Sequence, residues 1–142
     1  YMAKIELLEN PIFGAAIRRC HAFPVKRGES DRGAIKAAVT VLKEGRVLGL
    51  FPEGTRSKTG QLQKAEAGVA LIAAMTGAPI VPVAILNTHR IFANGGLLPQ
   101  LRIMYGAPMS FQGDRKSKEA LDIFSAEIMS HIAQMKDELS KM

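Results

Sequence analysis

Apolar residues recur at helical spacing in four stretches of the chain, and each stretch predicts an amphipathic helix. The first covers residues 2–19, where we expect a break before Pro11 because proline suits the first turn of a second short helix. The second ends at Gly45, where a left-handed C-terminal cap belongs, and Ser30 or Asp31 can cap its start. Both helices are expected to turn their apolar residues toward a core.

The third and fourth helical stretches differ in length and composition. Small residues dominate residues 65–76, and Gly77 is expected to end that helix. The fourth covers about residues 115–141, and its apolar stripe is Leu121, Phe124, Ile128, Ile132, Met135 and Leu139. Such a stripe usually packs on the protein's own sheet, with a membrane or a partner as the alternative.

Short apolar runs between the helical stretches predict strands. Residues 22–25 form the first, and Pro24 places it at an edge or at a strand end because proline cannot donate to a ladder. Residues 46–51 and 80–86 each predict a buried strand. Weak alternation over residues 101–105, ending at a glycine, predicts a further strand.

The alternation of helices and strands is typical of an α/β domain with a mostly parallel or mixed sheet flanked by helices. One helix separates the strand at 22–25 from the strand at 46–51, so we expect a parallel pair with a right-handed crossover. A length of 142 residues with 47% hydrophobic residues suits a single globular domain over residues 1–142.

Charge and cysteine content narrow the classes of function. The net charge of +6 suggests an anionic partner, such as nucleic acid, a phosphorylated substrate or an acidic membrane, although basic proteins without such a partner exist. Nucleic acid is not expected, since stacking aromatics are scarce and no helix-turn-helix is visible. The single Cys20 excludes an intrachain disulfide and favours a cytosolic setting. No apolar run reaches transmembrane length.

Polar residues follow the strand predicted at 46–51. Pro52 and Gly54 fit positions i+1 and i+3 of a type I turn. The turn carries these residues to the carboxyl end of the strand, where open α/β sheets build ligand sites: Glu53, Thr55, Arg56 and Ser57. Arg56 presents a planar fork of donors suited to phosphate or carboxylate, and Glu53 can accept from Arg56 or from a ligand hydroxyl. A surface turn with an ordinary Glu–Arg pair is the plainer alternative.

Three cations can meet in this layout. Arg27 follows one predicted strand, Arg56 follows the next, and Lys4 lies near the start of the first predicted helix. Because adjacent parallel strands end at the same edge of a sheet, Arg27 and Arg56 would together bind a phosphate monoester. From spacing alone, separate solvation of each cation is the simpler interpretation.

Four ordered segments resemble the motifs of the glycerophospholipid acyltransferases, the PlsC-like family. Residues 1–7 resemble the family's A-K-x-E-L segment, and residues 23–27 resemble its second motif, an apolar run closed by Arg. Residues 51–57, F-P-E-G-T-R-S, match the third motif throughout, and residues 80–83 resemble the fourth. Four matches in order are more specific than any single motif. Residues 87–142 add no diagnostic motif.

The resemblance implies acyl transfer from acyl-CoA or acyl-carrier protein to the hydroxyl of 1-acyl-glycerol-3-phosphate (lysophosphatidic acid), giving phosphatidic acid in phospholipid biosynthesis. It implies that the acceptor's phosphate is held by three cations, namely Lys4, Arg27 and Arg56. Glu53 and Gly54 would shape the acceptor site, with Glu53 orienting the glycerol hydroxyls or Arg56, and Thr55 would also bind the substrate. The resemblance also implies an apolar groove for the acyl chain, peripheral attachment at the cytoplasmic face of the membrane, and no metal or organic cofactor.

One family motif is missing from this sequence. The family's first motif is His-x4-Asp, in which His deprotonates the acceptor hydroxyl and Asp orients the imidazole. The three histidines have other residues five positions on: Lys26 after His21, Asn94 after His89 and Lys136 after His131. In the family this motif lies shortly upstream of A-K-x-E-L, so we expect it to precede Tyr1, with the domain N-terminally incomplete and no catalytic residue in this chain.

Two alternatives to this function stay open. The chain could be a catalytically incompetent fragment, or a phospholipid- or phosphate-binding module that turns nothing over. The enzyme could also use another acceptor, either glycerol-3-phosphate or a different lysolipid. Acceptor assays separate these alternatives.

Overall fold

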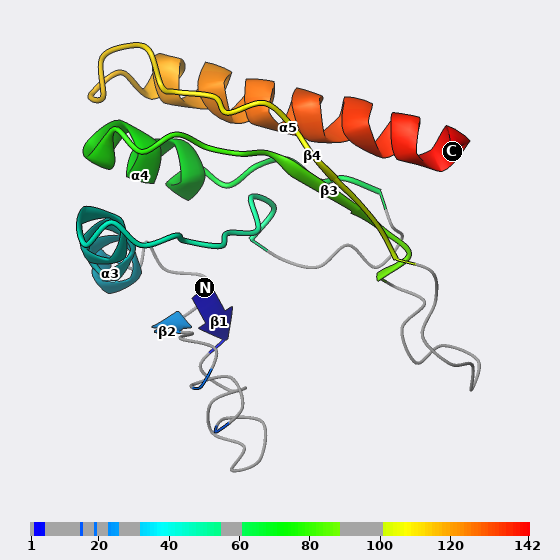
Figure 1. Ribbon diagram of the computed structural model, residues 1–142. Coiled ribbons are helices and arrows are strands. Elements are labelled where there is room, and N and C mark those ends of the chain that lie inside the picture. Colours follow the sequence, from blue (N-terminus) through cyan, green and yellow to red (C-terminus); the bar gives the residue numbers. More distant parts are fainter. Residues whose placement is uncertain are drawn as a thin grey trace. The chain divides into compact units, whose positions relative to one another are not determined.

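The computed structural model describes residues 2–4, 15, 19, 23–25, 32–54, 61–88 and 101–142 (Figure 1). The chain divides into two compact units, Tyr1–Phe51 and Pro52–Met142. The described elements of the first unit are β1 (Met2–Lys4), β2 (Phe23–Val25) and α3 (Arg32–Lys43). Those of the second unit are α4 (Gly68–Thr76), β3 (Val83–Leu86), β4 (Arg102–Tyr105) and α5 (Lys118–Lys141).

Strands β1 and β2 form a parallel pair in the first unit. Met2 lies opposite Phe23, and Lys4 lies opposite Val25. The strand predicted at 22–25 is therefore confirmed, whereas the helix predicted over 2–19 is wrong at residues 2–4. Pairing with a distant strand satisfies this backbone and overrides a weak local helical pattern. Further along the same stretch, Ala15 and Arg19 are helical as predicted.

Helix α3 matches its prediction closely. Ala34 and Ala38 are buried on its apolar face. Gly45 has φ of 73°, and its N–H donates to the carbonyl of Leu42 over 3.0 Å, which ends the helix with the expected left-handed residue. The two predicted N-terminal caps, Ser30 and Asp31, lie outside the described residues.

The buried strand predicted at residues 46–51 is wrong. These residues belong to no strand, and the side chains of Val47 and Phe51 are 93% and 72% exposed. Periodicity alone does not determine the structure of a short apolar run, and Gly49 weakens this one as a strand. The parallel partner of β2 is β1, so the pairing predicted between residues 22–25 and 46–51 is also wrong.

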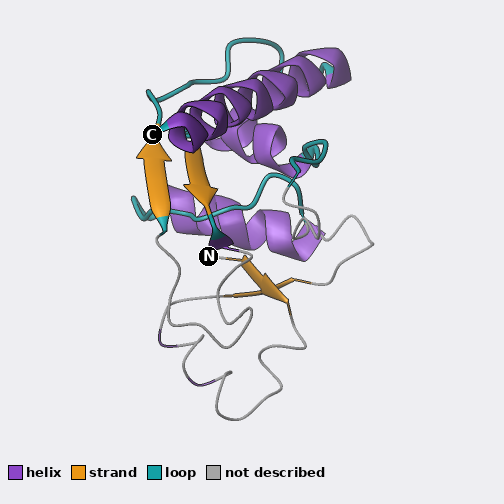
Figure 2. Cartoon of the chain, turned by 90° about the vertical axis from the view of Figure 1, so that its right-hand side faces the viewer, coloured by secondary structure: helices purple, strands orange, loops and turns teal. Residues whose placement is uncertain are grey.

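Strands β3 and β4 form an antiparallel pair in the second unit, with Val83 opposite Tyr105 (Figure 2). Two hydrogen bonds between Ile80 and Met109, of 2.7 and 2.8 Å, extend the pairing as an isolated bridge. The strand predicted at 80–86 is thus shorter than expected. It is also buried on one face only, because Ala84 is 2% exposed and Ile85 is 41% exposed.

Helix α5 lies along the β3–β4 pair and beside α4 (Figure 1). It starts at Lys118 rather than 115 because the Ser117 hydroxyl caps it, accepting from the Ala120 N–H over 3.2 Å. The core cluster consists of Ala70, Ala73, Ala84, Phe124, Ile128, Ile132, Met135 and Leu139, with Leu121 packed against it. This confirms that the apolar stripe of α5 packs on the protein's own sheet.

Helix α4 ends as predicted at Gly77, whose φ is 69° and whose N–H donates to the carbonyl of Ala73. It begins at Gly68, three residues later than the sequence pattern indicates. Within the described ranges, no helix combines the length and apolar character needed to cross a membrane.

Candidate functional site

The turn at residues 52–54, here called the 52–54 turn, opens the second unit. Pro52 and Glu53 lie in a turn, as the sequence predicts. Gly54 has φ of 62°, a conformation that favours glycine. A Cβ at this position would lie 2.8 Å from Cγ of Glu66, so space as well as backbone conformation favours glycine here.

Two hydrogen bonds join the 52–54 turn to backbone N–H groups that lie beyond the next segment of the chain. The backbone N–H of Gln63 donates to Oε2 of Glu53 over 2.8 Å. The backbone N–H of Glu66 donates to the carbonyl of Pro52 over 2.7 Å. The two ends of the stretch that contains Thr55 and Arg56 are therefore tied together.

The carboxylate of Glu53 serves a structural contact that the sequence did not indicate. We expected it to accept from Arg56 or from a ligand hydroxyl, and among the described residues it accepts from Gln63. A carboxylate that accepts a backbone N–H fixes its own position and that of the backbone opposite it. Glu53 therefore acts as a positioning residue for the base of this segment.

Neither Gln63 nor Glu66 was a predicted site residue. Their backbone N–H groups meet residues 52 and 53 across ten or more positions of the chain. No residue type or motif marks such a contact in a sequence, because a backbone donor is the same at every position except proline. The close approach of Glu66 to Gly54 leaves only an indirect signal, which is the glycine itself.

Lys4 lies in a different setting from the one expected. It ends strand β1 instead of starting a helix, and its backbone is opposite Val25. The parallel strands β1 and β2 end at the same edge, and Arg27 follows β2 by two residues. The register therefore brings the backbone of Lys4 to the edge from which the chain continues to Arg27.

Three predicted site residues, Arg27, Thr55 and Arg56, lie outside the described residues. The convergence of Arg27 and Arg56 on one phosphate therefore stays a prediction. What the structure does describe is the backbone that precedes two of the cations in the sequence: strand β2, which ends two residues before Arg27, and the 52–54 turn, which ends two residues before Arg56.

A surface hollow of about 570 Å³ lies elsewhere in the second unit. Its wall combines α5 with residues 108–112, and its ionisable side chains are Glu127 and His131. Among the described residues, a carboxylate and no lysine or arginine line this hollow, which suits a phosphate poorly. Neither Glu53 nor Gly54, the two predicted site residues whose burial the structure describes, lines it.

Comparison with known proteins gives consistent matches. Residues 1–86 match the model of the Acyltransferase family. Over 148 aligned residues the chain is 32% identical to the 1-acyl-sn-glycerol-3-phosphate acyltransferase of Bacillus subtilis (strain 168), covering 100% of this chain and 71% of that protein. It is also 32% identical to the Streptococcus pneumoniae protein of the same name, covering 97% of this chain and 51% of that protein.

A solved structure extends the likeness to the fold. The crystal structure of the 1-acyl-sn-glycerophosphate (LPA) acyltransferase PlsC from Thermotoga maritima matches with a TM-score of 0.75 at 27% sequence identity. The match covers 99% of this chain and 56% of that chain, so the present chain spans little more than half of that structure. The match confirms the predicted α/β fold class, and the described strands include both parallel and antiparallel pairs.

Proposed function

Because this chain belongs to the PlsC-like acyltransferase family, we propose that the complete protein acylates the hydroxyl of 1-acyl-glycerol-3-phosphate, giving phosphatidic acid. The acyl donor is a thioester, either acyl-CoA or acyl-carrier protein. The hydroxyl oxygen attacks the thioester carbonyl, a carbon–oxygen ester bond forms, and the carbon–sulfur bond breaks as the thiol leaves with the proton.

In this proposal the acceptor's phosphate is held by Lys4, Arg27 and Arg56. A guanidinium presents paired donors that match phosphate oxygens, and three cations suit a doubly charged monoester. The β1–β2 register supports a role for Lys4, because its backbone lies at the edge from which the chain leads to Arg27. Lys4 and Arg27 would thus approach the phosphate from one side.

The proposal depends most on the two hydrogen bonds that hold residues 52 and 53, which belong to the segment matching the family's third motif. The Glu53 carboxylate and the Pro52 carbonyl both accept backbone N–H groups from residues 63 and 66. We infer that ties between residues 52–53 and residues 63 and 66 would reduce the entropy that Arg56 loses when it binds a ligand. Glu53 and Gly54 would in this way present Arg56 and Thr55 to the acceptor.

The setting of the proposed reaction follows from its substrate. A lysolipid acceptor partitions to the bilayer, so the protein would work as a peripheral protein at the cytoplasmic face of the membrane. The net charge of +6 supports attraction to anionic lipid. The chemistry requires no metal or organic cofactor, because an oriented base and a bound thioester suffice for acyl transfer.

The test is an acyl-transfer assay on the complete protein with lysophosphatidic acid, glycerol-3-phosphate and a lysolipid without a phosphate monoester as acceptors. We expect preference for lysophosphatidic acid, and at least a roughly tenfold loss of kcat/KM in Arg56→Ala, since hydrogen bonds to charged groups contribute about 1.5–3 kcal/mol. Arg46→Ala is the matched control, because Arg46 forms an exposed ion pair with Glu44. Undiminished activity in Arg56→Ala, or equal rates with all acceptors, would contradict the proposal.

A second candidate function rests on the histidine spacing. No histidine in this sequence is followed by aspartate five residues on, so this chain by itself could bind the phospholipid without turning it over. The 142-residue chain should then bind lysophosphatidic acid and transfer no acyl group. Turnover by this chain alone would exclude the binding-module function and would require a base among its own residues.

A further inference from the structure

Helix α3 carries a basic stripe, which consists of Arg32, Lys36 and Lys43. Positions i, i+4 and i+11 lie within a narrow sector of a helix, and all three side chains are exposed. The stripe runs for about 16 Å, given a rise of about 1.5 Å per residue. The opposite face buries Ala34 and Ala38, so the orientation of the helix on its own unit holds the stripe outward.

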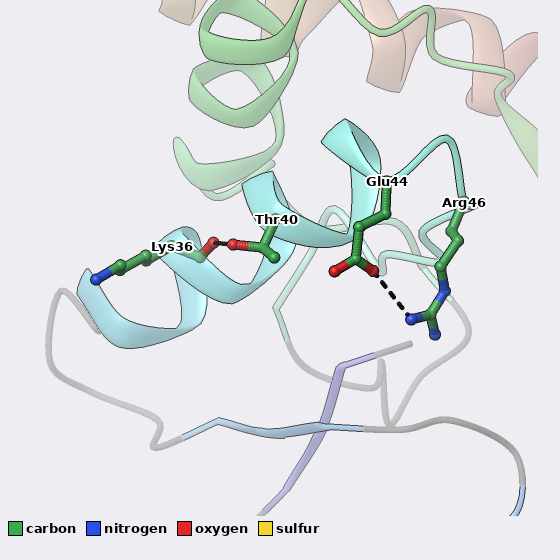
Figure 3. Close-up of polar contacts among 4 residues, drawn as sticks. All are labelled: Lys36, Thr40, Glu44 and Arg46. Carbon is green, nitrogen blue, oxygen red and sulfur yellow. Dashed lines mark hydrogen bonds and ion pairs between the residues drawn. The ribbon is translucent and has the colours of Figure 1, made fainter.

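The basic stripe is not neutralised by any described side chain. Helix α3 contains no acidic residue. The adjacent Glu44 turns to Arg46, whose Nη1 lies 3.2 Å from its Oε2, and Lys36 extends from the helix away from this pair (Figure 3). Within the described part of the chain, no carboxylate lies within ion-pair distance of the stripe.

Helix α5, the other long amphipathic helix, shows that the exposed side of a helix in this protein does not always carry charges of one sign. The charged residues of α5 include both signs, with acids in excess: Lys118, Glu119, Asp122, Glu127, Lys136, Asp137, Glu138 and Lys141. One of its bases, Lys141, pairs with Asp137 one turn earlier. Mixed charges of this kind keep a helix soluble, whereas charges of one sign attract a partner of the opposite sign.

We propose that the basic stripe of α3 is the surface through which the protein rests on anionic lipid headgroups. This inference rests on the proposed function, whose acceptor and product are anionic lipids of a bilayer. An acidic protein is the less suitable partner, because protein interfaces depend on buried aromatic or apolar anchors. The exposed residues of α3 between the cations are Gly33 and Thr40, and neither provides such an anchor.

Electrostatic adsorption to a charged bilayer does not require a buried aromatic or apolar side chain. Each lysine or arginine near an anionic membrane strengthens binding about fivefold, so three together contribute roughly a hundredfold. Because this attraction acts through solvent, it weakens as salt shortens the Debye length. The stripe therefore predicts binding that depends on both anionic lipid and low salt.

The experiment is co-sedimentation of the complete protein with phosphatidylcholine vesicles that contain either no phosphatidylglycerol or about 30% phosphatidylglycerol. We expect the variant Arg32→Gln/Lys36→Gln/Lys43→Gln to lose roughly a hundredfold in partitioning to the anionic vesicles. The matched control is Arg115→Gln/Lys116→Gln/Lys118→Gln, which removes the same charges from exposed positions in the turn before α5 and at its first residue. The control should lose less than about fivefold, and both variants should unfold at the wild-type temperature.

Three results would overturn the inference: equal losses in the two triple variants, wild-type binding by the α3 variant, or binding that ignores anionic lipid. A loss of transfer from acyl-carrier protein alone, with vesicle binding and transfer from acyl-CoA intact, would assign the stripe to an acidic protein instead. Acyl transfer in neutral detergent micelles separates the two proposals. The α3 variant should stay active in these micelles. An inactive wild-type protein would contradict the proposed function, and the vesicle experiment would then test the lipid-binding surface independently.

Discussion

The core under α5 and the 52–54 turn belong to the same compact unit but are stabilised by different kinds of interaction. The core combines side chains from α4, β3 and α5, and burial of apolar surface stabilises it. The turn is held by two hydrogen bonds, and Gly54 itself is exposed. Changes in the core should therefore affect global stability, whereas changes in the turn should affect geometry and activity.

The largest effect is expected from Phe124→Ala in the core. The Phe124 ring is 6% exposed and packs edge-on against Phe111 with centroids 5.5 Å apart. Its removal should lower the free energy of unfolding by about 3–5 kcal/mol, measured by denaturant titration. Ser125→Ala is the neighbouring control: Ser125 Oγ is buried and has no hydrogen-bond partner in the described part of the chain, so its loss should be neutral or stabilising. A loss below about 1 kcal/mol for Phe124→Ala would mean that this core is not closely packed.

Gly54→Ala should have the next largest effect. The added Cβ combines an unfavourable positive φ with a contact to Glu66, and we expect about 1–3 kcal/mol of destabilisation together with reduced acyl transfer. Gly45→Ala separates the two causes, because Gly45 has a similar φ of 73° with nothing within 4 Å of its Cβ position. If Gly45→Ala and Gly54→Ala lowered the free energy of unfolding equally, the contact between the added Cβ and Glu66 would contribute nothing to the destabilisation.

Glu53→Gln should destabilise less than Gly54→Ala but should still impair activity. The substitution keeps the size and removes the charge from the acceptor of the Gln63 N–H, which weakens a charge-assisted hydrogen bond without removing it. We expect faster amide exchange at Gln63 and a higher KM for the acceptor, with a nearly unchanged unfolding midpoint. Unaltered exchange at Gln63 would show that the carboxylate does not hold the turn in solution.

The smallest effect is expected at Lys141, on the solvent side of α5. The ammonium of Lys141 donates a hydrogen bond to the carboxylate of Asp137, and this bond, together with the negative charge of Asp137, raises the pKa of Lys141 above its ordinary value of 10.5. Since the folded-state pKa is raised, this contribution to stability is present below about pH 10.5 and is lost as the pH rises through the raised pKa. Asp137→Asn should lower the Lys141 pKa toward its ordinary value in an NMR titration and change stability at pH 7 less than Glu53→Gln. An unchanged Lys141 pKa would show that the pair does not form in solution.

The sequence predicted the core better than it predicted the sheet. The apolar stripe of α5 repeats over five turns, and a long repeat leaves one way to bury the face. Gly45 and Gly77 ended their helices as expected, because a left-handed cap has a local chemical signature. The strand predicted at residues 46–51 failed because strand pairing depends on distant partners that a short apolar run does not specify.

The candidate site shows the same difference between features with a local sequence signal and features that depend on distant partners. The turn at Pro52 and the need for glycine at position 54 follow from local residue chemistry. The partners that hold the turn, Gln63 and Glu66, contribute backbone N–H groups and so leave no residue-type signal. The strand that Lys4 ends was missed, because three residues are too few for periodicity to separate strand from helix.

The proposed binding of the acceptor's phosphate by Arg56 is tested most directly by a two-by-two binding measurement on the complete protein. Lysophosphatidic acid and the monoacylglycerol that lacks its phosphate are titrated calorimetrically against the wild-type protein and against Arg56→Gln. We expect the wild-type protein to prefer the phosphorylated ligand by at least roughly tenfold, and the variant to lose most of that preference. An identical preference in both proteins would contradict the assignment of Arg56 to the phosphate.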